Sequence, residues 1–98
     1  MTEVVLVRYT VADGHEERNA VLVRAVYAEL GVARPDGFRY ATLRDGTSFM
    51  HLALSDDGGS PLPDLGAFKA VQAGLRDRCV AGPDFARPEL VGSYHLPL

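Results

Sequence analysis

The stretch from residue 38 to residue 55 constrains the fold most, because it reads as two strands joined by a tight turn. Its sequence is FRYATLRDGTSFMHLALS, with Asp45-Gly46 at the centre. That dipeptide is typical of a type I′ hairpin turn, which needs positive φ at both central residues. The turn predicts that Arg44 pairs with Thr47 and thereby sets the register of both strands. A slip of one residue would exchange their two faces.

The predicted register divides the hairpin into an aromatic face and a largely aliphatic face. The first face holds Phe38, Tyr40, Thr42, Phe49, His51 and Ala53. The second holds Arg39, Ala41, Leu43, Ser48, Met50, Leu52 and Leu54. Directly opposite residues in a hairpin interact through their side chains, so Tyr40 is the expected cross-strand partner of His51.

The residues before the hairpin predict a strand and then a helix. Residues 3–11, EVVLVRYTV, are rich in β-branched residues and carry apolar residues on both parities. A strand of this kind is typically central in its sheet and covered on both faces. A helix follows, with Asp13 as its N-cap and Glu16 completing a capping box. We expect it to run to Leu30, with Gly31 ending it in the left-handed conformation.

The residues after the hairpin predict a second helix and a last strand. Ser60 or Asp64 caps the helix after a polar loop, and the Gly82-Pro83 pair ends it. Its apolar stripe consists of Phe68, Val71, Leu75 and Cys79. The last strand is expected at residues 89–96, with the sequence ELVGSYHL.

The order βαββαβ predicts a ferredoxin-like α+β fold, in which two helices cover one face of a four-stranded antiparallel sheet. With 98 residues, the chain fits a single domain over residues 1–98. The other sheet face needs a cover, and a second copy of the chain is the expected one, which predicts a homodimer through the sheet face.

Composition and charge exclude several classes of function. The net charge is −3 and the isoelectric point is about 5.5, which argues against a nucleic-acid partner. Cys79 is the single cysteine, so neither an intrachain disulfide nor a cysteine metal site is expected. The three histidines are scattered, and no metal is expected. No leader and no long apolar run are present, so we expect no membrane association and a cytoplasmic location.

Taken together, these segments resemble the dimeric α/β-barrel superfamily, in particular its small antibiotic-biosynthesis-monooxygenase-like proteins. The resemblance rests on the βαββαβ order, on SFMHLAL, on GGSPLPDLGAFKAVQAGLRDRC and on ELVGSYHL. It implies two sheets packed into a barrel, and a cavity in each subunit between sheet and helices. It also implies oxidation of an aromatic or polyketide-like molecule without any cofactor. In that reaction a base removes a proton, and the substrate carbanion passes an electron to O₂.

The chain departs from the enzymes it resembles at two points. Those enzymes use a tryptophan and an asparagine in the pocket. This chain has no tryptophan, and its single asparagine is Asn19, early in the first expected helix. The fold is therefore transferred more readily than the chemistry.

His51 is the main candidate for a catalytic residue, as the base. A histidine titrates near neutral pH and can take a proton from an acidic hydroxyl. Tyr40 would orient the ring or bind a substrate oxygen. The alternative is a buried neutral imidazole that is hydrogen-bonded to Tyr40 or to a backbone group.

Five further residues are candidates for substrate binding. Phe68 would line the cavity, together with Phe38 and Phe49 if their hairpin face meets the helices, or with Met50 if the opposite face does. The alternative is that these residues are core. Arg39 would hold an anionic or phenolate substrate, or would form an ion pair across the dimer interface.

Two functions stay open on these observations. The first is a cofactor-independent oxidation of an aromatic or polyketide-like small molecule. The second is a non-catalytic homodimer that is structural or binds a small hydrophobic ligand. Two observations would distinguish a binding site from the core of a dimer interface. They are the side of the sheet on which the aromatic hairpin face lies, and whether that face borders an empty space of ligand size.

Overall fold

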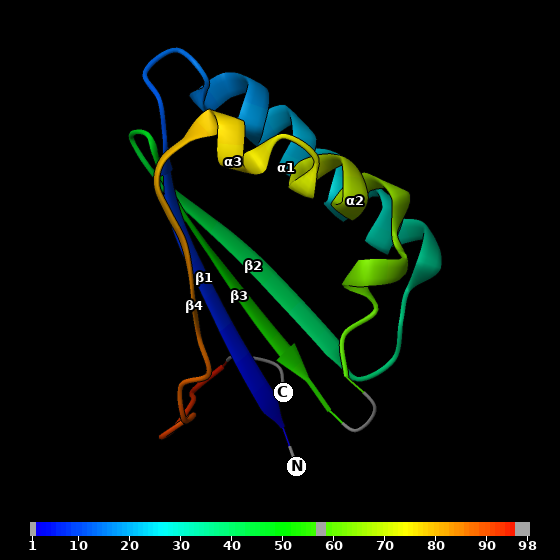
Figure 1. The fold of residues 1–98 in the computed structure, drawn as a ribbon. Helices are drawn as coiled ribbons and strands as arrows, with labels where there is room; N and C mark the ends of the chain where they lie inside the picture. The colour runs from blue at the N-terminus through cyan, green and yellow to red at the C-terminus, as the bar shows by residue number, and fades with distance from the viewer. Residues whose placement is uncertain (1, 57–58, 96–98) are drawn as a thin grey trace.

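The computed structural model describes residues 2–56 and 59–95, and its four strands form one antiparallel sheet with the order β2-β3-β1-β4. The helices cover one face of this sheet (Figure 1). The predicted ferredoxin-like α+β fold is therefore confirmed. In chain order the elements are β1 (Glu3–Val11), α1 (Glu16–Ala33), β2 (Phe38–Asp45), β3 (Ser48–Ser55), η1 (Leu62–Asp64), α2 (Gly66–Gln72), α3 (Leu75–Arg78) and β4 (Cys79–Ala86).

The β2–β3 turn lies one residue further along the chain than predicted. The expected pairing of Arg44 with Thr47 is wrong, because Asp45 pairs with Ser48 and closes the hairpin. Gly46 is the first central residue of the turn and has a φ of 62°. A glycine with positive φ at this position is typical of a type II′ turn, which suits the twist of a hairpin as well as type I′ does.

The changed register leaves both faces of the hairpin intact. Thr42, and not Tyr40, is the residue directly opposite His51. Each residue of β2 pairs with a β3 residue two positions further along the chain than predicted. Because side chains alternate between the faces with a period of two, the same side chains still share each face. Tyr40 becomes the diagonal neighbour of His51 and stays within reach of it.

The first helix begins and ends later than predicted. His15 occupies its N-cap position and makes no side-chain cap hydrogen bond, so the prediction of Asp13 as N-cap is wrong. The Glu16 carboxylate still accepts a hydrogen bond from the backbone N–H of Gly14 at 2.8 Å. Because Glu16 is the first residue of the helix and Gly14 precedes the N-cap, this bond is not the expected capping box.

The C-terminal end of α1 passes through Gly31, which was expected to end it. The helix runs to Ala33, and Arg34 ends it in the left-handed conformation with a φ of 47°. The N–H of Arg34 donates to the carbonyl of Leu30 at 2.7 Å. Pro35 follows directly and cannot continue a helix, so the proline decides the helix end and the glycine does not.

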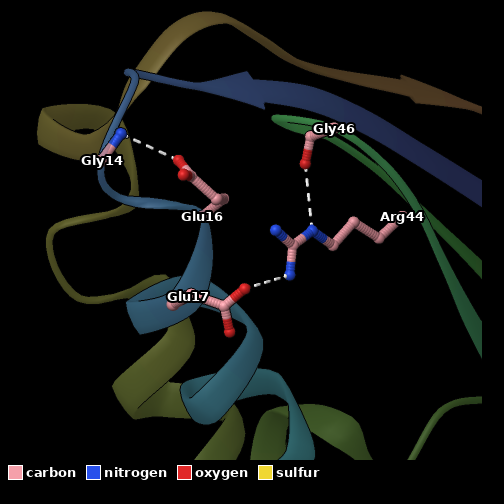
Figure 2. A network of polar contacts seen from close by, with 5 residues as sticks. All are labelled: Gly14, Glu16, Glu17, Arg44 and Gly46. Carbon is pink, nitrogen blue, oxygen red and sulfur yellow. Dashed lines mark hydrogen bonds and ion pairs between the residues drawn. The ribbon is translucent and has the colours of Figure 1, made fainter.

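An arginine of the hairpin connects the sheet to the start of α1 (Figure 2). Arg44 Nη1 donates to Glu17 Oε1 at 2.8 Å, and Arg44 Nε donates to the carbonyl of Gly46 at 3.0 Å. The hydrogen bond from Arg44 lowers the pKa of the Glu17 carboxyl. Both partners are exposed to solvent, so the pair contributes little to the stability of the fold.

The start of the second helix is capped by a different residue from those predicted. Leu65 occupies the N-cap position of α2 and makes no side-chain cap hydrogen bond, so neither Ser60 nor Asp64 caps this helix. Ser60 Oγ accepts the N–H of Leu62 at 3.1 Å at the start of the 3₁₀ turn, of which Asp64 is the last residue. In the first turn of α2, the N–H of Ala67 donates to the Glu29 carboxylate of α1 at 3.2 Å. A side chain from another helix therefore satisfies an N–H group that no helical carbonyl can reach.

The second helix is also much shorter than predicted, because Gly74 interrupts it. α2 ends at Gln72, Ala73 is extended, and Gly74 then adopts the left-handed conformation with a φ of 74°. Gly82, which was expected to stop the helix, lies within β4 instead. A Cβ atom at that position would lie 2.7 Å from the carbonyl oxygen of Arg8, so only glycine permits this close approach to β1.

The fourth strand is β4, and the predicted strand at 89–96 is wrong. β4 pairs with the free edge of β1, where Phe85 lies opposite Val7, and its register shifts twice, first between Arg8 and Thr10 and again between Thr10 and Val11. Residues 87–95 form no strand and are exposed, and Leu96 lies outside the described residues. The edge of β1 is therefore filled by the segment that follows α3 directly. β1 is central, as predicted, because it pairs with both β3 and β4.

The two faces of the sheet differ in what covers them. Two clusters of buried side chains fill the space between sheet and helices; they consist of Val23, Val26, Leu62, Leu65 and Val71, and of Tyr9, Val11, Ala20 and Phe49. On the opposite face, Leu6, Met50 and Leu52 are only half-buried. Among the described helices, none is long and apolar enough to cross a membrane.

Candidate functional site

A cavity of about 230 Å³ lies on the helix-covered face, between the sheet and α2. Its wall is mostly apolar and includes a few polar side chains, which is the pattern of small-molecule sites. The lining residues are Val5, Val7, Tyr9, Tyr40, His51, Ala53, Ser55, Ser60, Leu62, Pro63, Phe68, Val71, Gln72, Leu75 and Phe85. The aromatic face of the hairpin thus meets the helices and borders an empty space.

His51 projects from β3 toward the helices and is hydrogen-bonded at both ring nitrogens. Nε2 lies 2.7 Å from Tyr9 Oη, and Nδ1 lies 2.7 Å from Tyr40 Oη and 3.0 Å from Thr42 Oγ1. The ring stacks between the two tyrosines, with centroid distances of 5.3 Å and 5.8 Å. The imidazole is only 6% exposed, so protein groups and the cavity make up its surroundings.

The hydrogen bonds of His51 continue in both directions through the protein. Asn19 Nδ2, from α1, donates to Tyr9 Oη at 2.9 Å, and Arg78 Nη2 donates to Asn19 Oδ1 at 3.1 Å. On the other side, Thr42 Oγ1 lies 2.7 Å from Tyr27 Oη of α1. We call this set the polar chain; its members are Arg78, Asn19, Tyr9, His51, Tyr40, Thr42 and Tyr27.

Arg78 anchors one end of the polar chain. Its side chain is 7% exposed and donates to the carbonyls of Val71 at 2.7 Å and Ala73 at 3.1 Å. These carbonyls lie at the C-terminal end of α2, where no further helical N–H is available to them. Within residues 2–56 and 59–95, the guanidinium makes no ion pair with a carboxylate, so carbonyl oxygens alone stabilise its charge.

Burial keeps the titratable groups next to the cavity uncharged. It lowers the pKa of His51 to about 4 and raises the pKa values of Tyr9, Tyr27 and Tyr40. In each case removal of water from around the charged form is the largest cause. His51 is therefore a neutral imidazole at pH 7, with one nitrogen that donates and one that accepts.

The structure brings some of the predicted site residues together and separates others. His51, Tyr40 and Phe68 line the cavity. Phe38 and Phe49 share this sheet face but do not line the cavity. Phe38 packs against the cluster around Val26, and Phe49 stacks on Tyr9 with a centroid distance of 5.6 Å.

Met50 and Arg39 lie on the opposite face of the sheet. Met50 borders a hollow of about 480 Å³ near the β2–β3 turn, together with Arg8 and Asp84. Arg39 Nη1 lies 3.5 Å from Asp56 Oδ1, close enough for an ion pair but without the geometry of a hydrogen bond. Neither residue can reach the cavity through the sheet.

Of the seven members of the polar chain, only His51 and Tyr40 were expected as site residues from the sequence. Asn19 is fully buried on the same side of α1 as Ala20 and Val23, and a polar residue within an apolar stripe was the signal for it. Tyr9 shares its strand parity with Val7 and Val11 and was a recognisable candidate for the same reason. Arg78 carried no such signal, because its position depends on the break at residue 74.

The single cysteine was placed on the wrong element. Cys79 is the first residue of β4 and is half-buried beside Leu75, so it is not part of a helical stripe. Burial raises the pKa of its thiol, and the positive charge of Arg78 opposes this as a smaller effect. A raised thiol pKa is typical of an unreactive cysteine.

The fold and the site together define a ferredoxin-like α+β protein with an apolar cavity and a buried polar chain between its sheet and helices. No protein-family model matches the sequence, and no curated protein matches it. Solved structures do match it. An antibiotic biosynthesis monooxygenase-like protein from Chloroflexus aurantiacus has a TM-score of 0.69 and 12% identity, over 99% of this chain and 100% of that one.

Two further solved structures show the same architecture. An antibiotic biosynthesis monooxygenase-like protein from Caulobacter crescentus has a TM-score of 0.69 and 17% identity, over 93% of this chain and 91% of that one. A variant of SnoaB, a cofactor-independent oxygenase from Streptomyces nogalater, has a TM-score of 0.67 and 19% identity, over 99% and 98%. The chain therefore has the fold of antibiotic-biosynthesis-monooxygenase-like proteins, as its sequence predicted, and these identities show the fold alone.

Proposed function

We propose that the chain binds a small aromatic or polyketide-like molecule in the cavity and oxidises it with O₂, without a metal or a flavin. One observation carries the proposal: His51 and Tyr40 are among the few polar groups of a mainly apolar wall, and they are hydrogen-bonded to each other. The likeness to SnoaB, a cofactor-independent oxygenase, supports it at the level of the fold.

In this proposal His51 is the base and Tyr40 binds or orients the substrate oxygen. Both ring nitrogens contact hydroxyl groups, so a substrate proton reaches the ring through a tyrosine. The tyrosine oxygen accepts the proton while its own hydrogen passes to the imidazole. The substrate carbanion then gives an electron to O₂, and the oxidised CH₂ group becomes a carbonyl with release of one water.

The low pKa of His51 restricts which substrates this base can serve. Transfer of a proton from a simple phenol of pKa about 10 to a group of pKa about 4 is uphill by roughly 8 kcal/mol. A phenol that is conjugated with a carbonyl group is more acidic, because the carbonyl delocalises the phenolate charge, and this lowers that cost. We therefore expect substrates of this more acidic kind.

An oxygen electrode tests the proposal directly. Small quinols and hydroxynaphthalenones are offered to the protein, to His51→Ala and to the control Tyr27→Phe, which changes a phenol of the polar chain that does not line the cavity. We expect the His51 variant to lose oxygen uptake while circular dichroism shows an unchanged fold. Uptake that is equal in the His51 variant would contradict the assignment of the base.

A second function is favoured by one specific observation. Both nitrogens of the His51 ring are already occupied by protein hydroxyls, and the cavity is smaller than the roughly 300–1,000 Å³ that is usual for ligand sites. These features suit a homodimer that is structural or binds a small hydrophobic ligand without turnover. Saturable binding of such ligands, with no oxygen uptake for any of them, would favour this function over the first.

We further propose that a second copy of the chain covers the open sheet face. Leu6 and Leu52 are cross-strand partners on this face, and Met50 lies beside them. In a two-fold contact this apolar centre would meet its own copy, which is how sheet faces pack in symmetric dimers. Arg8, opposite Met50 on β1, and Arg39, on the edge strand β2, would then border this apolar centre.

A further inference from the structure

We propose that Arg78 is a positioning residue that holds His51 in the tautomer with the hydrogen on Nδ1, so that the cavity offers the hydroxyl hydrogen of Tyr40 to a carbonyl or phenolate oxygen of its ligand. This inference rests on the proposed function in one respect, which is that the cavity is the binding site. The direction of the hydrogen bonds follows from the polar chain itself.

The first step is the orientation of Asn19. An arginine side chain can only donate hydrogen bonds, so the Asn19 atom that faces it must be the amide oxygen. Arg78 Nε and Nη2 lie 3.3 Å and 3.1 Å from Asn19 Oδ1. The carbonyls of Val71 and Ala73 hold the guanidinium in this place. The NH₂ group of Asn19 therefore points to Tyr9.

The second step is the direction of the bond between Tyr9 and His51. Tyr9 Oη accepts the hydrogen bond from Asn19 Nδ2 at 2.9 Å. Its own hydrogen is buried and needs an acceptor. Among the described contacts of this hydroxyl, His51 Nε2 at 2.7 Å is the one remaining polar atom. Nε2 thus accepts, and Nδ1 carries the ring hydrogen.

The third step concerns the hydroxyl that faces the ligand. The N–H at Nδ1 donates to Tyr40 Oη at 2.7 Å, with Thr42 Oγ1 at 3.0 Å as a second acceptor. Tyr40 has then used its oxygen as acceptor and keeps its hydrogen. A contact with Thr42 lowers the pKa of Tyr40, against the larger effect of burial. The Thr42 oxygen already contacts Tyr27 and His51, so we do not assign it as the acceptor of the Tyr40 hydrogen. Tyr40 lines the cavity, so a ligand oxygen can take this hydrogen.

The class of ligand follows from this direction. A donor hydroxyl on an apolar, aromatic wall selects a flat molecule with an acceptor oxygen, such as an aryl ketone, a quinone or a phenolate. The same tautomer makes Tyr9 the route to the basic nitrogen Nε2. A substrate with a hydroxyl next to a carbonyl would match both groups.

The tautomer is measured by NMR on the protein with labelled histidine, because the ring carbon and nitrogen shifts differ between the two neutral forms. We expect the Nδ1–H form in the wild-type protein. Asn19→Asp keeps the acceptor for Arg78 but replaces the donor to Tyr9 by a second acceptor. Tyr9 then donates to the new carboxylate, and His51 must turn to the Nε2–H form.

Val21→Asp is the matched control, because it adds a carboxylate to an exposed position of α1, away from the polar chain. We expect it to leave the tautomer unchanged. An Nε2–H form in the wild-type protein would overturn the inference, and this measurement needs no variant to fold. A folded Asn19→Asp protein that keeps the Nδ1–H form would overturn it as well.

Ligand binding tests the donor hydroxyl separately. The probes are 1-tetralone and tetralin, which share a skeleton and differ in the carbonyl group. We expect wild-type protein to bind 1-tetralone about tenfold more tightly, which is the effect of one net hydrogen bond, and Asn19→Asp to lose this preference. Equal affinities in the wild-type protein would overturn the donor assignment. If neither probe binds while the tautomers are as expected, the proposed function fails and the tautomer assignment stands.

Discussion

The two faces of the sheet are built in opposite ways. The helix-covered face buries an imidazole, tyrosine hydroxyls and a guanidinium, and each of them is hydrogen-bonded within the polar chain. The open face has no such groups at its centre and leaves Leu6, Met50 and Leu52 half-exposed. Buried polar groups require partners, whereas exposed apolar strand residues indicate a missing cover. This difference supports the two proposals that the helix-covered face holds the binding site and that a second copy covers the open face.

The largest effect is expected from a charge on the open face. Leu52→Glu places two like charges at the centre of the proposed two-fold contact, which costs several kcal/mol, so the dimer should dissociate. Sedimentation velocity measures this. Val21→Glu puts the same charge on the exposed side of α1 and should leave the dimer intact. A wild-type protein that sediments as a monomer would refute the proposed contact.

The anchor of the polar chain gives the next largest effect. Arg78→Ala leaves the Val71 and Ala73 carbonyls and the Asn19 amide oxygen without their donor. We expect a loss of about 3–5 kcal/mol in the free energy of unfolding, measured with urea, because each unsatisfied buried acceptor is costly. Arg76→Ala removes an exposed arginine of the same short helix and should change stability by less than about 0.5 kcal/mol. Equal effects of the two substitutions would show that the polar chain adds no stability.

The buried imidazole predicts a pH dependence of stability. The unfolded chain takes up a proton on His51 near pH 6.5, whereas the folded chain resists it down to about pH 4. Stability is therefore complete above pH 6.5 and falls as the pH drops, by about 3 kcal/mol at pH 4. The neighbouring phenols of Tyr9 and Tyr40 stay neutral throughout, because burial raises their pKa values.

Urea unfolding at several pH values measures this contribution as a difference between proteins. His51→Gln should remove most of the slope between pH 6.5 and pH 4. His15→Gln, which changes an exposed histidine, is the matched control. If the slope of the His51 variant equals that of the wild-type protein, the imidazole is not held neutral in the folded state.

The smallest effect distinguishes two tyrosines of the polar chain. Tyr40→Phe removes the hydroxyl on the cavity wall, and we expect about tenfold weaker binding of 1-tetralone, measured by calorimetry. Tyr27→Phe removes the hydroxyl at the far end, which contacts Thr42 and does not line the cavity. The affinity of the Tyr27→Phe variant for 1-tetralone should stay unchanged. Equal losses of affinity in both variants would indicate that both substitutions disturb the polar chain as a whole, and that Tyr40 makes no specific contact with the ligand.

The parts of the fold that depend on local patterns could be predicted from the sequence. Alternation and the Asp45-Gly46 signal gave the two hairpin faces correctly, although the turn lies one residue later. The wrong turn position did not change which side chains share a face, because the pairing partners moved by two residues and side chains alternate with a period of two. The same alternation placed His51 on one face with Tyr40, but it did not decide whether that face meets the helices or a second copy; the cavity lining shows that it meets the helices.

The last quarter of the chain could not be predicted in the same way. Residues 89–96 alternate like a strand but form none within the described part, whereas β4 contains the Gly82-Pro83 pair that reads as a stop signal. What decides between the two segments is the free edge of β1, a tertiary feature. The polar chain was hidden for a related reason, since Arg78 and Asn19 are 59 residues apart.

Methyl NMR during a titration with 1-tetralone shows where a ligand binds, because the methyl groups of both sheet faces are observed at once. Val7 and Leu75 line the cavity, and Leu6 and Leu52 lie on the open face. We predict saturable shifts for the methyl groups of Val7 and Leu75 and none for those of Leu6 and Leu52. Shifts confined to the open face, or no shifts at all, would contradict the cavity beside His51 as the binding site.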